Sequence, residues 1–467
     1  MLYPRQFERR VVATGNVSLV VLGVFFAALA YWQVFRTDLA QEKYNPRLVS
    51  AFNDPGRGRI LDRNGGVLAA TLPSGQRSYP DPSVAHEVGY IDPRFGSSGA
   101  EFVFNSFLSG RAGAGGWSAA FSAEFSRTAR TGLDVRLTID PAIQRAASQS
   151  LGARTGAVVA LDPRTGEVLA MVSVPTFDPG AIAKDGDQLV KDPTSPLLNR
   201  ATQGSYPPGS TFKTVTAISA LENGVITPQT SVTCAGQYVV DGFPISCNNV
   251  VQGNGTYPFK NAFTYSVNAI FAQVGVALGW DRLQATAERL GFGQSLNFTL
   301  DTAPTQITNP GTALTKTLLA NTAFGQGELL TTPLEMATIA AAIANGGVLA
   351  SPHLGLAVMD GNTVVDRLEQ PTFKRVIGAD VAATLNDFMV SVVDAGQAAG
   401  VAIPGVKVAG KTGTAETGSG TSHAWFIAFA PADNPTIAVA VIAEDGGRGS
   451  VVAAPIAGAV IKAALGR

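Results

Sequence analysis

The chain has 467 residues, more than a single hydrophobic core usually supports, so we expect two folded domains. Hydrophobic residues make up 46% of the sequence, which excludes disorder along the whole chain. The formal net charge of −1 provides no basic excess for a nucleic-acid partner. His86, His353 and His423 lie far apart without metal-ligand spacing. We therefore expect no metal, no cofactor and no Ser/His/Asp hydrolase.

A long apolar segment lies near the N-terminus. The residues from Val11 to Phe35 include no charged side chain, and a helix needs about 20 apolar residues to cross a bilayer. Arg5, Arg9 and Arg10 precede the segment, and an arginine excess is typical of the cytoplasmic side. The sequence therefore predicts a cytoplasmic tail (1–10), a single transmembrane helix (11–35) and an extracytoplasmic remainder.

Two other interpretations of this segment stay open. Ala28-Leu29-Ala30 is similar to a signal-peptide cleavage site, so a cleaved signal peptide is one alternative, and a buried helix of a soluble domain is the other. The apolar run continues past Ala30 to Phe35, which favours the membrane anchor. A signal peptide would place the rest of the chain outside the plasma membrane as well.

The two cysteines, Cys234 and Cys247, fall in the part predicted to be exported. Asp241-Gly242 between them is a hairpin-turn signal with apolar residues on both sides. A hairpin there would bring the cysteines together, and an oxidising compartment would favour a disulfide. The alternative is two small buried thiols.

The residues after the apolar segment divide into two regions. Residues 36–135 have weak periodicity and many turn residues, including two short expected strands around an Asn-Gly turn within 57–68 and a Gly/Ala-rich loop at 110–116. Residues 136–467 alternate clear strand and helix patterns. Strands are expected at 157–161, 168–172, 406–412, 424–430 and 436–443, and helices at 283–290, 333–344 and from about 453. Strands at both ends with helices between them predict an α+β domain whose sheet combines distant segments.

A Ser-x-x-Lys pair opens one of the predicted helices. Pro207-Pro208-Gly209 breaks any preceding element, and apolar residues then recur every three positions from Phe212 to Leu221. Ser210 is therefore expected in the first turn of a buried helix, with Lys213 one turn later on the same face.

The pair suits nucleophilic catalysis if the lysine is neutral. A serine hydroxyl needs a base to take its proton, and without a usable histidine Lys213 is the candidate. Burial and a second cation both lower a lysine pKa, so the site needs another positive group nearby. The helix N-terminus would favour an oxyanion at the serine.

Two further segments strengthen this interpretation. Ser266 and Asn268 lie at the expected start of a second helix, and Lys411-Thr412-Gly413-Thr414 lies on an expected strand. A Ser-x-x-Lys pair alone should occur about once by chance in this chain. The three segments in this order on these elements are much less expected by chance.

Together the three segments resemble the active-site motifs of penicillin-binding proteins and serine β-lactamases. Segments 57–69, 161–171 and 324–333 are similar to class B transpeptidases in particular, and the short N-terminal module resembles compact actinobacterial members. The likeness covers almost everything after the apolar segment. It implies a transmembrane helix, a small β-rich pedestal (36–135) and a transpeptidase/β-lactamase-like domain (136–467) with an antiparallel sheet flanked by helices.

The resemblance also implies a role for each motif residue. Ser210 would attack the penultimate D-alanine carbonyl of a peptidoglycan stem peptide, and Lys213 would take the serine proton. Ser266, held between Lys213 and Lys411, would relay a proton towards the leaving amine. Asn268 would bind the substrate backbone, and Lys411 with Thr412, Gly413 and Thr414 would hold the substrate carboxylate. The backbone N–H groups of Ser210 and Thr414 would form the oxyanion hole. β-Lactams would acylate Ser210, and a SEDS-family glycosyltransferase would be a partner.

Other functions stay open at this point. A D,D-carboxypeptidase differs from a transpeptidase only in its acceptor. A β-lactamase would need a base for deacylation, and no acidic residue stands in the expected context. A β-lactam sensor would need a cytoplasmic output domain, but only about ten residues precede the apolar segment. A scaffold role in the cell wall is the non-catalytic alternative.

Overall fold

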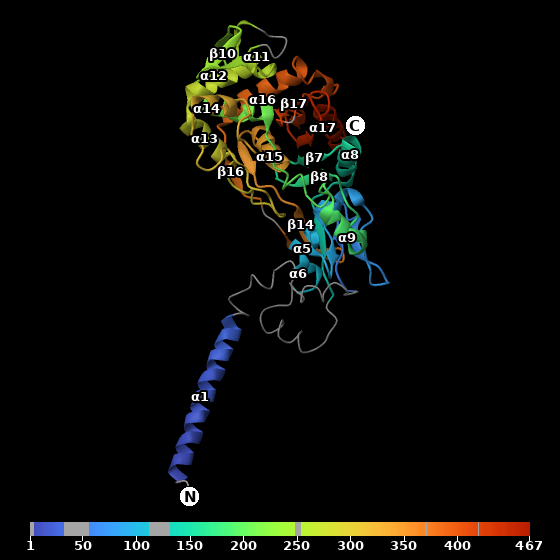
Figure 1. Ribbon diagram of the computed structural model, residues 1–467. Helices are drawn as coiled ribbons and strands as arrows, with labels where there is room; N and C mark the ends of the chain where they lie inside the picture. Colours follow the sequence, from blue (N-terminus) through green and yellow to red (C-terminus); the bar gives the residue numbers. More distant parts are fainter. Residues whose placement is uncertain (1–3, 32–55, 112–130, 248–253, 369–370, 419) are drawn as a thin grey trace.

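A computed structural model describes residues 4–31, 56–111, 131–247, 254–368, 371–418 and 420–467 (Figure 1). Helix α1 (Pro4–Ala30) begins before the apolar segment and includes the charged residues that precede it. The end of the predicted span, from Trp32 to Phe35, lies outside the described residues, as does most of the loop at 110–116. No described helix is both long and apolar enough to cross a membrane. The predicted transmembrane helix is therefore not confirmed.

A five-stranded antiparallel sheet forms the centre of the larger domain. Its order is β17 (Ala409–Glu416), β18 (Ser422–Ala430), β19 (Ile437–Ala443), β7 (Gly156–Leu161) and β8 (Val168–Val174). Every residue of β19 is buried because helices cover both faces. Helices α8 (Pro141–Leu151) and α17 (Ala453–Ala464) lie on one side, and α15 (Pro333–Ala344) and α16 (Ala379–Asp394) on the other (Figure 1). The expected α+β sheet of distant segments is confirmed.

A second sheet belongs to the smaller, lower part of the molecule. Its order is β15 (Thr363–Arg367), β14 (Gly355–Asp360), β6 (Asp134–Leu137), β1 (Ile60–Leu61), β2 (Val67–Thr71) and β3 (Arg77–Ser78). Strand β6 pairs in parallel with β1 and antiparallel with β14. Strands from both sides of residue 135 therefore share one sheet, and the division of the chain at that residue stays a prediction.

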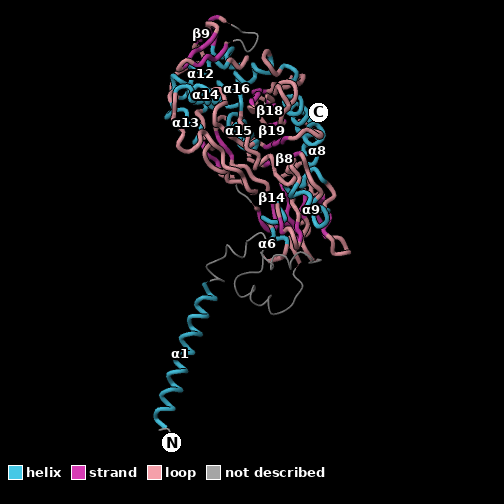
Figure 2. The backbone as a smooth tube through the Cα atoms, viewed as in Figure 1, coloured by secondary structure: helices cyan, strands magenta, loops and turns pink. Residues whose placement is uncertain are grey.

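Helices with two small two-stranded sheets form the upper part of the larger domain (Figure 2). The hairpin of β10 (Gln237–Val240) and β11 (Phe243–Ser246) turns at Asp241-Gly242, as predicted. Cys234 and Cys247 form a disulfide at its base, which confirms the predicted pair and excludes two free thiols.

Most strand and helix predictions agree with the structure, with one clear shift. The strand predicted at 406–412 begins at Ala409, because Val406 N donates to Ile403 O across a turn in which Gly405 has a positive φ. The remaining elements are η2 (Pro82–Val84), α4 (Ala85–Val88), β4 (Ile91–Asp92), β5 (Gly96–Ser97), α5 (Gly99–Val103), α6 (Asn105–Leu108), η3 (Pro179–Ala181), α9 (Ile182–Lys191), η4 (Gly209–Phe212), α10 (Lys213–Glu222), β9 (Ser231–Cys234), β12 (Gly255–Pro258), α11 (Phe259–Thr264), α12 (Asn268–Leu278), α13 (Trp280–Arg289), α14 (Lys316–Ala323), β13 (Val348–Ala350), β16 (Phe373–Arg375) and η5 (Ala399–Val401).

Candidate active site

Ser210 lies in a tight turn that packs against the sheet. The turn is the 3₁₀ helix η4, and the α-helix begins only at Lys213, so the predicted first helical turn is wound more tightly than expected. Gly209 has a φ of 55°, and a Cβ there would lie 2.7 Å from Thr414 O. A glycine is required at this position because the turn approaches the backbone of β17 so closely.

The Lys213 ammonium is held among oxygen atoms at the base of the site. Its Nζ donates to Ser266 O at 2.7 Å, to Ser266 Oγ at 2.9 Å and to Asn268 Oδ1 at 2.6 Å. The side chain is fully buried, and Nζ lies 5.3 Å from the centroid of the Phe271 ring. Within the described part of the chain, the hydrogen-bond acceptors of Lys213 Nζ all belong to the second motif.

Lys411 reaches the same hydroxyl from the opposite side. Its Nζ donates to Ser266 Oγ at 3.0 Å and to Thr412 O at 3.0 Å. Burial lowers the pKa of Lys411 to about 7. Burial, and then the neighbouring charge of Lys411, hold the pKa of Lys213 well below its ordinary value of 10.5. The second cation that the sequence argument required is therefore present, and either lysine can lose its proton far more readily than a lysine in water.

Ser266 owes its position to an unusual backbone conformation. It lies in the turn between α11 and α12, with a φ of 59°, and α12 starts two residues later at Asn268. Of the two residues expected at the start of this helix, Asn268 is therefore its first residue and Ser266 lies in the preceding turn. A positive φ is costly for a serine, and it places the hydroxyl between the two lysines.

The third motif borders the opening of the site. Thr412 and Thr414 line the cleft, whereas Lys411 and Gly413 are buried beneath it. A Cβ on Gly413 would lie 2.8 Å from Trp425 Cβ and 3.0 Å from Thr211 Cγ2. The absence of a side chain at this position lets β17 approach the turn that carries Ser210.

Sequence reasoning missed Gln397, which connects two of the motifs. Its Nε2 donates to Tyr265 O at 3.1 Å, and its Oε1 accepts from Thr412 Oγ1 at 2.9 Å. Gln397 also lines the cleft. No local pattern marks this residue, because its partners are far away in the sequence.

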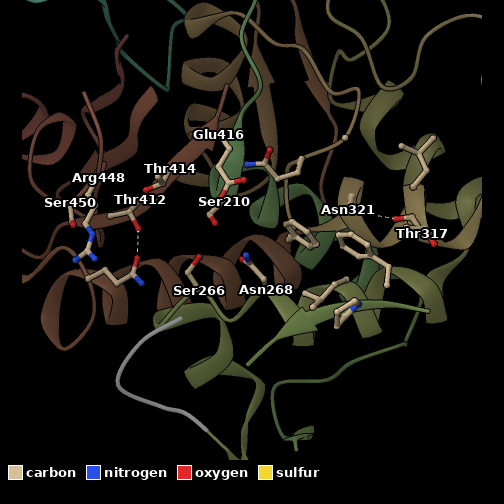
Figure 3. A pocket seen from close by; sticks show the side chains of 18 of the residues that line it. Ser210, Ser266, Asn268, Thr317, Asn321, Thr412, Thr414, Glu416, Arg448 and Ser450 are labelled. Atoms are coloured by element: carbon tan, nitrogen blue, oxygen red, sulfur yellow. Dashed lines mark hydrogen bonds between the residues drawn. The ribbon is translucent and has the colours of Figure 1, made fainter. Parts of the chain in front are cut away.

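The cleft has a volume of about 1320 Å³ and two different ends. Ser210, Ser266 and Asn268 lie in its middle (Figure 3). One end is largely apolar and is formed by the disulfide-bonded hairpin and α14. Arg448 and Ser450, which the sequence analysis also missed, lie at the other end beside Thr412 (Figure 3). Within the described residues, no group of three His, Cys, Asp or Glu side chains could hold a metal ion.

Comparison with known proteins agrees with this arrangement. The model of the penicillin-binding protein transpeptidase domain matches residues 156–462. The peptidoglycan D,D-transpeptidase PbpA of Mycolicibacterium smegmatis is 35% identical over 98% of each chain. The penicillin G acyl-enzyme complex of penicillin-binding protein A from M. tuberculosis has a TM-score of 0.78 at 33% identity, covering 88% of this chain and 99% of that one. Penicillin-binding protein 2 of Pseudomonas aeruginosa has a TM-score of 0.74 at 33% identity, covering 88% and 96%.

The matched region contains all three motifs, and the relatives span nearly the full length of the chain. The chain therefore belongs to the class B penicillin-binding proteins, the family of transpeptidase-domain proteins that includes PbpA.

Proposed function

We propose that this chain is a peptidoglycan D,D-transpeptidase that forms an acyl-enzyme on Ser210 and is acylated there by β-lactams. One observation carries the proposal: Ser266 Oγ lies 2.9 Å from Lys213 Nζ and 3.0 Å from Lys411 Nζ in the cleft that Ser210 lines. The relatives named peptidoglycan D,D-transpeptidases and the penicillin G acyl-enzyme structure support the same reaction.

In the first step, Ser210 Oγ attacks the carbonyl carbon of the penultimate D-alanine, and neutral Lys213 Nζ takes the hydroxyl proton. The backbone N–H groups of Ser210 and Thr414 would stabilise the oxyanion. Asn268 would position the peptide backbone, and the side of the cleft with Thr412 and Thr414 would hold the terminal carboxylate.

In the second step, the bond to the terminal D-alanine breaks, and its nitrogen takes a proton. Ser266 is placed to deliver that proton, because its hydroxyl contacts both lysine ammonium groups. The amine of a neighbouring stem peptide then attacks the ester carbonyl and forms the cross-link. As the ester bond breaks, Ser210 takes the proton that this amine loses. Lys213 must change its protonation state during the cycle, and its lowered pKa makes this change easier than for a lysine in water.

The location of the enzyme belongs to the same proposal. Peptidoglycan substrates lie outside the plasma membrane, and a disulfide is typical of an oxidising compartment. The arginines that precede the apolar segment 11–35 are typical of the cytoplasmic side. We therefore place residues 36–467 outside the membrane, anchored by that segment. The N-terminal module would bind the SEDS-family glycosyltransferase that the family resemblance implies. Recovery of the full chain in the soluble fraction of disrupted cells, without detergent, would argue against the anchor.

Intact-mass measurement of the purified chain with benzylpenicillin tests the activity. We expect a stable one-to-one adduct that maps to Ser210 and is absent from Ser210→Ala. Ser205→Ala, a change in the same segment outside the cleft lining, serves as the control that keeps labelling. Rapid loss of the adduct with release of hydrolysed drug would identify a β-lactamase instead. Labelling that persists in Ser210→Ala would overturn the nucleophile assignment.

A further inference from the structure

Charge is distributed unevenly along the cleft. The described residues that line it include two charged side chains, Arg448 beside Thr412 and Glu416 at the last position of β17. Thr412, Thr414 and Glu416 alternate along the strand, so they share one face and follow one another along the cleft, as Figure 3 shows. Four residue steps of a strand span roughly 13 Å, so Thr412 and Glu416 lie well apart. The cleft therefore offers separate places for an anionic and a cationic group of one ligand.

Glu416 is available to bind an external cation. Its side chain is exposed, and no described Lys, Arg or His forms an ion pair with it. It is also the only acidic side chain among the described residues that line the cleft. Asp241, in the turn of the β10–β11 hairpin, accepts a hydrogen bond from Thr317 Oγ1 at 3.3 Å and does not belong to the lining.

The uncharged oxygen acceptors of the lining are weaker partners for a cation. Asn268 Oδ1 already accepts from Lys213 Nζ at 2.6 Å. The other polar side chains of the lining, among them Thr414 and Asn321, carry no charge. An ionised acceptor forms a stronger hydrogen bond than a neutral one. A cationic group in this cleft is therefore expected at Glu416.

The position of β17 in its sheet indicates which part of a ligand reaches Glu416. Among the described strands β17 pairs only with β18, so its other side is an open edge, and an extended peptide can lie along such an edge. In the proposed reaction the terminal carboxylate lies beside Thr412 and the reacting carbonyl at Thr414 N, so the preceding residue of the peptide continues toward Glu416. In an extended peptide this residue lies about 7 Å from the last one, and its side chain extends farther.

We propose that Glu416 forms a cation subsite that binds a primary ammonium group of a stem peptide. The residue before the two D-alanines of a stem peptide is a diamino acid, so the donor peptide carries an amine on the side chain that extends toward Glu416. The amine of the acceptor peptide is the second source of the same group. This inference rests on the proposed function and adds a specificity residue to it. No bond is made or broken at Glu416, so it selects the ligand and takes no part in the chemistry.

Two penicillins that differ by one charge test the donor peptide as the source. The first has an ε-aminocaproyl side chain, and the second is its N-acetyl derivative, which has no ammonium group. The rate constants for acylation of the full chain are measured by intact mass at low ionic strength, where exposed charges are least screened. We expect Glu416→Gln to slow acylation by the amine about 3- to 10-fold, because a hydrogen bond between two charged groups is lost. Acylation by the acetylated penicillin should change less than about twofold.

A transfer reaction tests the acceptor peptide as the source. A benzoyl-D-alanyl thioester, which has no ammonium group, acylates the full chain, and Nα-acetyl-lysinamide supplies the attacking amine. The ratio of amide product to hydrolysed product is measured by mass spectrometry. If Glu416 binds the acceptor amine, Glu416→Gln should lower this ratio about 3- to 10-fold, while both penicillins react as they do with the wild-type chain.

Two further variants separate charge recognition from a folding effect. Glu416→Asp should keep part of the preference for the amine, because it retains the charge on a shorter side chain. Glu288→Gln, which removes an exposed carboxylate of α13 outside the cleft lining, should leave every rate unchanged. Equal slowing with both penicillins, or no change in either assay, would overturn the subsite. A wild-type chain that neither penicillin acylates would refute the proposed function itself.

Discussion

Two regions of this molecule bury charged side chains, and they do so in opposite ways. Below the cleft, two lysines share one hydroxyl, and no described acidic group pairs with either. In the N-terminal module, two arginines surround one glutamate: Arg57 Nη2 lies 2.6 Å from Glu101 Oε2, and Arg77 Nε lies 2.7 Å from Glu101 Oε1. Both groups are almost completely buried.

The difference explains why one cluster is reactive and the other structural. Burial alone would raise the pKa of Glu101, but the charges and hydrogen bonds of Arg57 and Arg77 outweigh it and lower that pKa. The glutamate therefore stays ionised between its two arginine partners. Lys213 and Lys411, held without a counter-ion, can release their protons. The neighbouring positive charge of Lys411 helps to lower the pKa of Lys213 and so favours loss of its proton, whereas the arginines keep Glu101 ionised and in place.

The largest expected effect follows from removing the base. Lys213→Ala should slow acylation of Ser210 by about 10²- to 10⁴-fold, because general-base assistance is worth a factor of that size. The melting temperature should not fall greatly, since no ion pair of the described residues depends on Lys213. Acylation at the wild-type rate in the intact-mass assay would rule out Lys213 as the base.

Changes in the cluster of Glu101, Arg57 and Arg77 should lower the unfolding free energy and leave the acylation rate unchanged. Glu101→Gln leaves two buried arginines without an ionised partner, which should cost about 3 to 5 kcal/mol of unfolding free energy. The exposed pair of Arg94 and Asp187 provides the control, because Arg94→Ala should cost at most about 1 kcal/mol. Denaturant unfolding measures both values. Equal costs for the two variants would contradict the distinction between buried and exposed pairs.

The acid sensitivity of the module has a defined direction. The folded-state pKa of Glu101 is lowered below 4.5, so its ion pairs stabilise the fold above the unfolded-state pKa. This contribution is lost as the pH falls below about 4.5 through the lowered folded-state value. In Glu101→Gln this part of the acid dependence should be missing when unfolding is followed at a series of pH values. An unchanged acid dependence would show that Glu101 does not control it.

The smallest effect is expected from opening the disulfide between Cys234 and Cys247, which carries no charge. Cys234→Ser opens the disulfide at the base of the β10–β11 hairpin, which should lower the unfolding free energy by about 3 kcal/mol or less. Acylation at low temperature should persist, because no residue of the motifs contacts the disulfide directly in the described part of the chain. An unchanged melting temperature in oxidising buffer would show that the disulfide does not stabilise the domain.

The sequence was informative wherever a feature depends on neighbouring residues. The Ser210–Lys213 spacing, the Asp241-Gly242 turn and the helix 333–344 are local patterns, and the structure places all three where they were expected. The segments that carry Ser210, Ser266 and Lys411 also meet at one cleft. Their recognition depended on short motifs with known spacing.

Features that depend on distant contacts could not be predicted in the same way. Gln397 acts through Tyr265 and Thr412, and Arg448 faces the cleft because Gly449 lies on Gly413. The positive φ of Ser266 occurs in the turn between α11 and α12 and has no local signal such as glycine. The joining of β14 to β6 in the lower sheet likewise requires the complete fold.

The pH dependence of acylation tests the central claim most directly, namely that burial and Lys411 keep Lys213 neutral enough to act as a base. The rate constant for benzylpenicillin acylation of the full chain would be measured by intact mass from about pH 5 to about pH 10, within the range where a perturbed lysine titrates. We expect the rate to rise and reach its plateau well below the ordinary lysine pKa of 10.5. A rate that is still increasing as the pH approaches 10.5 would show that the lysine pKa is not lowered, and would contradict this account.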